Sequence, residues 1–305
     1  MLNFFQSHDL NSRFALPQPV TIQYQALSIA QHEAGSRRKG RPCHWCGSSD
    51  VTAKLAVDLV AGGTKGIGRA IVQEFLAEGA HVHLCSRTPQ DVTETVQKLQ
   101  SSATESGGSV TGDVVDVSDE KQIVDWVKTS AASSGKIDVV VSNVSALAMG
   151  NDTSAWSKAF QVDILGTVAL VNAALPHLER SKGAIVAISS VSGRDVDFTA
   201  TSPYGALKAS LTHYMAQLAH TQAPKGIRAN TVSPGNIYIE DGVWGSIEKG
   251  NPELFKSQLA KNPTGRMGTA QEVANAVVFL SSSRASFISG TNLVVDGALC
   301  TGVQQ

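Results

Sequence analysis

Cysteine is scarce in this chain of 305 residues, which has Cys43, Cys46, Cys85 and Cys300 and no others. Four scattered thiols are too few for a disulfide framework, and they favour a reducing, cytoplasmic location. The chain also lacks an excess of charge of either sign, because 25 Lys and Arg residues stand against 26 Asp and Glu residues. This balance gives no reason to expect nucleic acid or an anionic membrane surface as a partner.

Long apolar runs are missing as well, and none approaches the ~20 residues that a membrane-spanning helix needs. We therefore expect no membrane partner. The start of the chain lacks the pattern of a secretory signal, because Met1–Phe5 is followed at once by polar residues. A mitochondrial presequence stays open as an alternative to a cytoplasmic protein. The basic cluster Arg37–Arg41 fits a presequence, whereas Asp9 and Glu33 do not.

Residues 1–52 differ from the rest in having no sustained hydrophobic periodicity and three prolines. We predict that they form a disordered N-terminal extension before a single domain over 53–305. Cys43 and Cys46 have the spacing of half a zinc site. No second pair of ligands follows, so we expect no metal site.

From Lys54 onward, short apolar runs alternate with amphipathic stretches. The predicted strands are Ala56–Ala61, His81–Cys85, Val110–Val115, Val139–Ser142, Ala184–Ser189, Arg228–Val232 and Asn292–Val295. The predicted helices are Gly66–Glu78, Glu120–Ser133, Ala155–Arg180, Pro203–Thr221 and Gln271–Leu280. Strands without polar alternation are typical of parallel sheets covered on both faces. We predict an α/β fold, a Rossmann-like doubly wound parallel sheet of about seven strands with helices on both faces.

A glycine-rich segment, Gly62–Gly68, lies between the first predicted strand and the first predicted helix. Glycines there permit a tight turn and let the backbone approach a pyrophosphate at the start of a helix. The second strand is followed by Ser86 and Arg87 and lacks the acidic residue that usually binds the ribose 2′-hydroxyl of NAD. Arg87 and Lys65 supply two cations for a 2′-phosphate, which favours NADP(H) over NAD(H).

Tyr204 and Lys208 are four residues apart, so they project from one face of a predicted helix. A cation beside a phenol favours the ionised phenol, as acid–base catalysis requires. The pair follows Ser189 and Ser190 and precedes Ser233–Gly235. This ordered set, with the glycine segment, resembles the short-chain dehydrogenase/reductase family from about Lys54 to Gly297.

The resemblance implies that Tyr204 protonates the substrate oxygen, that Lys208 favours the phenolate and binds the nicotinamide ribose, and that Ser190 polarises the carbonyl. Ser189 is the alternative to Ser190, because the segment before Tyr204 is one residue longer than is usual in the family. The implied cofactor contacts are Gly62, Thr64, Lys65, Gly66, Ile67, Gly68, Ser86, Arg87, Asp116, Val117, Asn143, Tyr204, Lys208, Pro234, Gly235 and Ile237. A homodimer or homotetramer is also implied, assembled through the helices that bear Asp163 and Tyr204.

Four positions depart from the family pattern. Ala61 stands for a threonine, Ser142–Ser145 for Asn-Asn-Ala-Gly, and Ile239 for a threonine that often contacts the carboxamide. Asp163 replaces the asparagine that helps to hold a proton-relay water. We count Asp163 among the catalytic residues, since a carboxylate only accepts hydrogen bonds and could pair with Lys208.

The chemistry predicted from these residues is an NADP(H)-dependent oxidoreductase, a ketoreductase that interconverts a ketone or aldehyde and the corresponding alcohol. A 3-oxoacyl-thioester reductase and a secondary-metabolite ketoreductase are alternatives within the enzymes. A cofactor-binding sensor or scaffold with little turnover is the alternative outside them. The segment 238–263 is predicted to be a substrate lid, in which Trp244 and Phe255 either contact a ring-bearing substrate or anchor the lid.

Overall fold

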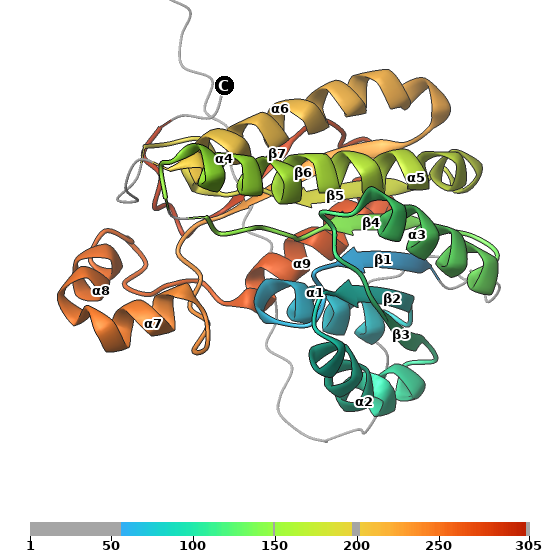
Figure 1. Ribbon diagram of the computed structural model, residues 1–305, viewed down its shortest axis with the longest axis horizontal. Coiled ribbons are helices and arrows are strands. Elements are labelled where there is room, and N and C mark those ends of the chain that lie inside the picture. The colour runs from blue at the N-terminus through green and yellow to red at the C-terminus, as the bar shows by residue number, and fades with distance from the viewer. Residues whose placement is uncertain (1–55, 149, 197–201, 303–305) are drawn as a thin grey trace, which may run out of the picture. The chain divides into compact units, whose positions relative to one another are not determined.

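The computed structural model describes residues 56–148, 150–196 and 202–302, so the predicted extension 1–52 lies outside it (Figure 1). The described residues contain a parallel sheet of seven strands in the order β3-β2-β1-β4-β5-β6-β7. The strands are β1 Val57–Ala61, β2 His81–Ser86, β3 Ser109–Val114, β4 Val139–Ser142, β5 Ala184–Ile188, β6 Arg228–Pro234 and β7 Asn292–Val295. The predicted doubly wound sheet is confirmed.

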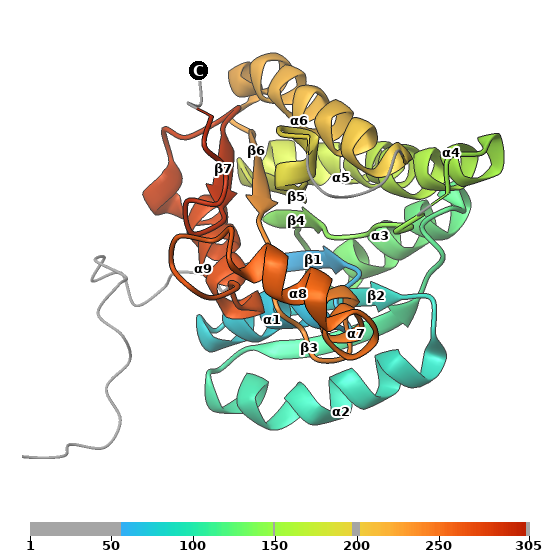
Figure 2. The ribbon, with the colours of Figure 1, turned by 90° about the vertical axis from the view of Figure 1, so that its left-hand side faces the viewer.

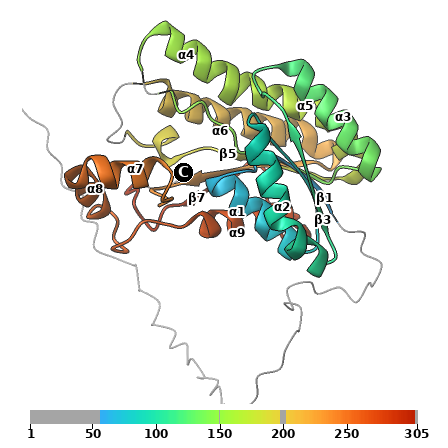
Figure 3. The same cartoon turned by 60° about the horizontal axis from the view of Figure 1, so that its bottom comes forward.

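Helices cover both faces of this sheet, as Figure 3 shows from below. One face packs against α1 Gly66–Ala77, α2 Pro89–Glu105 and α9 Ala270–Ser281. The other packs against α3 Glu120–Ser134, α5 Gly166–Ser181 and α6 Pro203–Gln222. The inner strands β1, β4 and β5 are buried along their whole length, which accounts for their largely apolar sequences.

The predicted helix Ala155–Arg180 is not one regular α-helix. It consists of α4 (Thr153–Ala159), a π-helical turn (Phe160–Leu165) and α5. By length and composition, the whole stretch Thr153–Ser181 is apolar enough to cross a membrane, but half of its most apolar window is buried in the structure. Packing of α5 in the core beside α3 and α6 explains this apolar composition.

Two strands meet at the point where the order of the sheet changes direction. These are β1 and β4: from β1 the chain crosses to β2, and from β4 it crosses the opposite way, to β5. The backbone N–H of Asn143, after β4, donates to the carbonyl of Ala61 (3.1 Å), and its side-chain amide donates to the carbonyl of Gly62 (3.0 Å). Ligands of doubly wound sheets bind at such a switch point, so Asn143 fixes the edge at which the site is expected.

Asp58 is a buried acid in the middle of the sheet. It is fully inaccessible in β1, and neither carboxylate oxygen has a hydrogen-bond partner among the described residues. Burial raises the pKa of this carboxyl well above its usual value, and nearby Asp138 raises it further. Because the pKa of Asp58 is higher in the folded chain than in the unfolded chain, the free energy of unfolding falls as the pH rises from the unfolded value towards the folded value. Over this range the folded chain holds a proton that the unfolded chain has released.

Asp58→Val is therefore expected to raise the free energy of unfolding by about 1–3 kcal/mol, the usual cost of an unsatisfied buried polar group. The gain should grow with pH, because the wild-type chain alone loses stability there. Urea unfolding at several pH values measures both effects. Asp138→Ala is the control and should destabilise, since Asp138 accepts from Val57 N (2.8 Å) and pairs with Lys136 (2.9 Å). A destabilised Asp58→Val protein would contradict this account.

Candidate active site

Tyr204 and Lys208 lie one turn apart near the start of α6, which begins at Pro203. Proline is favoured in the first helical turn because it has no N–H that would be left unpaired there. Both side chains line a cavity of about 330 Å³ beyond the carboxyl ends of the strands. The described residues around it are Ile67, Asn143, Val144, Ser145, Leu147, Ile188, Ser189, Ser190, Tyr204, Lys208, Pro234, Gly235, Ile237, Ile239, Gly242, Val243 and Trp244.

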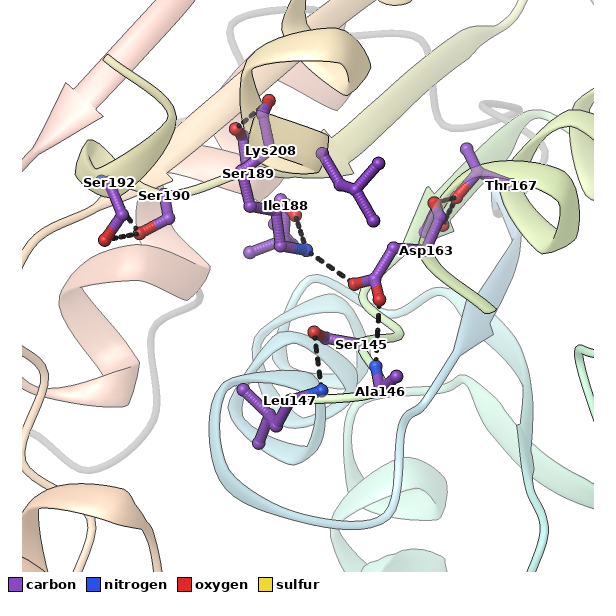
Figure 4. Close-up of polar contacts among 12 residues, drawn as sticks. Ser145, Ala146, Leu147, Asp163, Thr167, Ile188, Ser189, Ser190, Ser192 and Lys208 are labelled. Carbon is purple, nitrogen blue, oxygen red and sulfur yellow. Dashed lines mark hydrogen bonds and ion pairs between the residues drawn. The ribbon is translucent and has the colours of Figure 1, made fainter. Parts of the chain in front are cut away.

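Lys208 is buried, and its ammonium group is held from two sides. Nζ donates to the carbonyl oxygen of Ile188 (3.1 Å) and lies 3.3 Å from Oδ1 of Asp163, as Figure 4 shows. The same nitrogen lies 5.8 Å from the centre of the Tyr204 ring. Since only 4% of each ionised side chain is exposed, the ion pair is weakly screened by solvent. The positive charge is fixed beside the phenol.

Asp163 reaches Lys208 from the π-helical turn. Its Oδ2 accepts a hydrogen bond from the backbone N–H of Ala146 (3.0 Å), which joins the turn to the segment after β4. Its Oδ1 faces Lys208, where the sequence predicted that a carboxylate could pair. Loss of one partner of a buried pair leaves the other charge uncompensated, so each residue constrains the other.

The two serines after β5 have different surroundings. Ser189 Oγ donates to the backbone carbonyl of Lys208 (2.8 Å) and accepts from Thr212 (3.1 Å), so it ties β5 to α6. Ser190 Oγ accepts from the backbone N–H of Ser192 (3.1 Å) and donates to its hydroxyl (3.2 Å), so its bonds stay within its own turn, and it borders the cavity. The hydroxyl of Ser190 is therefore the one that can turn to a ligand without detaching β5 from α6.

The glycine segment forms an anion cradle at the start of α1. Gly62 and Gly66 have φ values of +77° and +52°, which side-chain-bearing residues rarely adopt. A Cβ on Gly68 would lie 2.0 Å from the carbonyl oxygen of Gly62, so only glycine permits this approach. Helix α1 has neither a side-chain cap nor an acid in its first turn. Its first N–H groups are thus suited to the pyrophosphate of a dinucleotide.

Lys65 and Arg87 lie at the same edge, because they follow the neighbouring strands β1 and β2. Lys65 is 74% exposed and pairs with Asp91 (2.8 Å), and Arg87 is exposed. The pKa of Asp116, after β3, is lowered mainly by a hydrogen bond from the Ser118 backbone and to a lesser degree by Arg87. Arg87 therefore lies close to the end of β3, with its charge available at the surface.

The predicted cofactor residues fall into two groups. Those that border the cavity are Ile67, Asn143, Tyr204, Lys208, Pro234, Gly235 and Ile237. Those that lie outside its lining are Gly62, Thr64, Lys65, Gly66, Gly68, Ser86, Arg87, Asp116 and Val117. The second group follows β1, β2 and β3, at the carboxyl ends of these strands. The carbonyl of Thr64 accepts from Thr95 (3.3 Å) and anchors the loop to α2.

Several residues of the cavity wall were not predicted. Leu147 is half exposed and has a φ of +46°, a strained conformation for a residue with a branched side chain. Val243 is also half exposed and belongs to α7 (Val243–Gly250). The sequence indicates these two residues only by their position, because each follows the end of a strand after a short loop. Apolar side chains thus form much of the wall.

The aromatic residues of the predicted lid divide between the cavity wall and a cluster of rings. Helices α7 and α8 (Pro252–Leu259) lie together beyond the carboxyl edge of the sheet (Figure 2). Trp244 borders the cavity and also packs edge-to-face against Phe255, with ring centres 6.4 Å apart. Phe255 in turn contacts Tyr238 at 6.1 Å. One ring faces the cavity, and the other two hold its helix in place.

A larger cavity of about 810 Å³ lies at the opposite, amino ends of the strands, between Lys136, Gly183, Arg228 and Ser282. Its cations already have partners. Arg228 donates to the carbonyls of Leu280, Ser281 and Ser282 at the end of α9. None of the motifs identified in the sequence reaches this cavity, so the smaller one is the candidate active site.

Comparison with known proteins gives a consistent relationship. The family model described as enoyl-(acyl carrier protein) reductase matches residues 61–299. Isoepoxydon dehydrogenase of Penicillium expansum is 40% identical over 247 residues, which are 81% of this chain and 95% of that protein. A short-chain dehydrogenase/reductase structure from Burkholderia xenovorans has a TM-score of 0.75 at 31% identity and covers 82% of this chain and 98% of its own.

L-sorbose reductase of Gluconobacter frateurii, solved with NADPH and L-sorbose, is similar at a TM-score of 0.72 and 26% identity, over 82% of this chain and 98% of that one. These proteins share the fold, and the family match extends over most of the described residues. The chain belongs to the short-chain dehydrogenase/reductase family, whose members are oxidoreductases that bind nicotinamide dinucleotides.

Proposed function

We propose that this protein reduces a ketone or aldehyde with NADPH, or oxidises the corresponding alcohol with NADP⁺, and that Tyr204 transfers the proton. The observation that supports this best is the convergence of Tyr204, Lys208 and Ser190 on one cavity beside the glycine cradle. Consumption of NADPH in the presence of small carbonyl compounds tests the proposal.

Each side chain has a defined task in this reaction. The nicotinamide, when bound, supplies or accepts the hydride. Tyr204 Oη donates a proton to the substrate oxygen in reduction and takes it back in oxidation. Lys208 stabilises the phenolate through its buried charge, and Ser190 Oγ donates a hydrogen bond to the substrate oxygen.

Binding without turnover is the second candidate, and the Asp163–Lys208 pair favours it. The carboxylate lies 3.3 Å from Nζ and cancels part of the positive field that Tyr204 needs. Intact Tyr204, Lys208 and Ser190 nevertheless support catalysis, because a sensor has no need of a proton donor. A sensor would bind NADPH without consuming it.

Lys65 and Arg87 support NADP(H) as the cofactor, because a 2′-phosphate at this edge would meet both cations, of which Lys65 also pairs with Asp91 (2.8 Å). Arg87→Asp is expected to raise the Kd for NADPH about 10- to 100-fold, since a charge-assisted contact worth about 1.5–3 kcal/mol gives way to repulsion. NADH binding should change less than about twofold on the same reasoning, because NADH has no 2′-phosphate.

Fluorescence titration with both cofactors measures this difference. Lys121→Asp reverses a charge that is 84% exposed on the other face of the sheet and serves as the control. Equal losses for NADPH and NADH in Arg87→Asp would refute the proposed phosphate site.

The cavity wall supports a compact, uncharged substrate. Among the described lining residues, Lys208 is the charged one, and Asp163 compensates it. We include the segment 238–263 in the proposal as the lid, since α7 contributes Val243 and Trp244 to the wall. The alternative substrate class is the 3-oxoacyl thioesters, so acyl thioesters belong in the same assay.

Self-association is part of the same proposal. Trp156, Phe160 and Leu165 are large apolar side chains of α4 and the π-helical turn that are 38–46% exposed. Apolar side chains gathered on one surface are typical of interfaces. They support a homodimer or homotetramer through the helices that bear Asp163 and Tyr204.

A further inference from the structure

The last residues of the described chain contact the segment that carries Ser190. After β7, Gly297 and Ala298 both have φ values of +65°, and the chain turns back on itself. The carboxylate of Asp296 holds this turn, because Oδ1 accepts from Ala298 N (2.9 Å) and Oδ2 from Cys300 N (2.8 Å). The residues 297–302, here called the C-terminal segment, thus have a defined backbone path.

Two side chains that follow Ser190 bind this C-terminal segment. The guanidinium of Arg194 donates to the backbone carbonyl of Gly302, and its Nε lies 3.5 Å from Oδ1 of Asp195. The thiol of Cys300 lies near the carboxylates of Asp195 and Asp296 and has one proton to donate to either of them. Burial and these carboxylates raise the pKa of the thiol to about 12, so it keeps the proton that it can share with them.

Asp296 also connects the C-terminal segment to the rest of the cavity wall. Its backbone carbonyl accepts a hydrogen bond from the buried side chain of Asn262 (2.8 Å), which follows α8 at the end of the proposed lid. A Cβ on Gly235 would lie 2.7 Å from the Cβ of Asp296, so the segment packs directly against a residue that lines the cavity. Asp296 therefore contacts Gly235 and the end of the proposed lid directly, and it holds Cys300, which lies near Asp195.

We propose that Arg194, Asp195 and Cys300 are positioning residues, which clamp the Ser190 segment to the C-terminal segment and so set the shape of the substrate side of the cavity. This inference rests on the proposed function, because its kinetic test needs turnover. The three residues lie outside the cavity lining, so they act on the substrate through Ser190 and its neighbours.

Cys300→Ala and Cys300→Ser form the matched pair for the test. Alanine removes the donor between the two carboxylates, whereas a hydroxyl preserves it. We expect Cys300→Ala and Arg194→Ala to raise KM for the carbonyl about tenfold, because small displacements of positioning groups weaken a near-attack geometry. The Kd for NADPH, kcat and the melting temperature should change little, and Cys300→Ser should retain the wild-type KM.

An unchanged KM in both alanine variants would overturn the proposal. So would a parallel loss of NADPH affinity and melting temperature, which would indicate general support of the fold. Deuterium uptake over 191–195 in the full chain with NADPH provides a readout that is independent of turnover. Faster uptake in Cys300→Ala than in Cys300→Ser supports the clamp, and equal uptake contradicts it even if the wild-type protein proves inactive.

Discussion

Tyr204→Phe is expected to lower the rate of carbonyl reduction about 10²- to 10⁴-fold, the range that a positioned general acid contributes. The change removes the oxygen to which we assign proton transfer and keeps the ring whose centre lies 5.8 Å from Lys208 Nζ. Binding of NADPH should remain nearly intact, because the glycine cradle and the cations at the ends of β1 and β2 are untouched. Steady-state rates and a cofactor titration measure the two effects separately.

Tyr214→Phe is the matched control for this substitution. Tyr214 lies on the same helix, α6, and packs against the core instead of lining the cavity. Its pKa is raised by burial, so its hydroxyl remains protonated. The control should keep wild-type rates, and a Tyr204→Phe enzyme with more than about a tenth of wild-type activity would place the acid elsewhere.

Asp163→Asn is expected to move the pH dependence of both reaction directions to lower pH by about one unit. Loss of the carboxylate leaves the charge of Lys208 uncompensated, and the stronger positive field favours the phenolate of Tyr204. The rate of alcohol oxidation at neutral pH should therefore rise. As the pH is raised, the rate of carbonyl reduction should begin to fall at a lower pH than in the wild-type enzyme. The amide also adds a hydrogen-bond donor for a relay water.

Rates in both directions across the pH range test this prediction. Asp152→Asn is the control, since Asp152 caps α4 at the start of the same helical stretch and asparagine caps equally well. Activity lost at every pH would mean that the carboxylate itself is required as the partner of Lys208 or of the substrate. An unchanged profile would reduce Asp163 to a structural residue of the π-helical turn.

The sheet could be predicted almost completely, because the inner strands are buried and leave short apolar runs, while the edge strands β3 and β7 are less buried. Helix α2 was missed for a physical reason. Its buried positions are Val92, Thr95, Leu99 and Ala103, so the spacing is helical but a polar and a small residue weaken the apolar signal. The π-helical turn also escaped prediction, since one extra residue within a long helix hardly disturbs the apolar pattern.

The candidate site was predictable where it depends on local spacing. Tyr204 and Lys208 follow from their separation on one helix, and the choice of Ser190 over Ser189 is supported by the structural bonds of Ser189. The strained Leu147 and the clamp between Arg194 and Gly302 depend on contacts between distant segments. No pattern within a single stretch of sequence encodes such contacts.

The central claim is that the protein turns over NADPH at the cavity of Tyr204. Its most direct test is NADPH consumption by the purified wild-type chain with a panel of uncharged ketones, quinones and acyl thioesters, each paired with the same assay in NADH. The account predicts consumption with at least one compact uncharged carbonyl compound, and faster with NADPH than with NADH. Tight binding of NADPH without consumption across the whole panel would contradict it and identify a cofactor-binding protein instead.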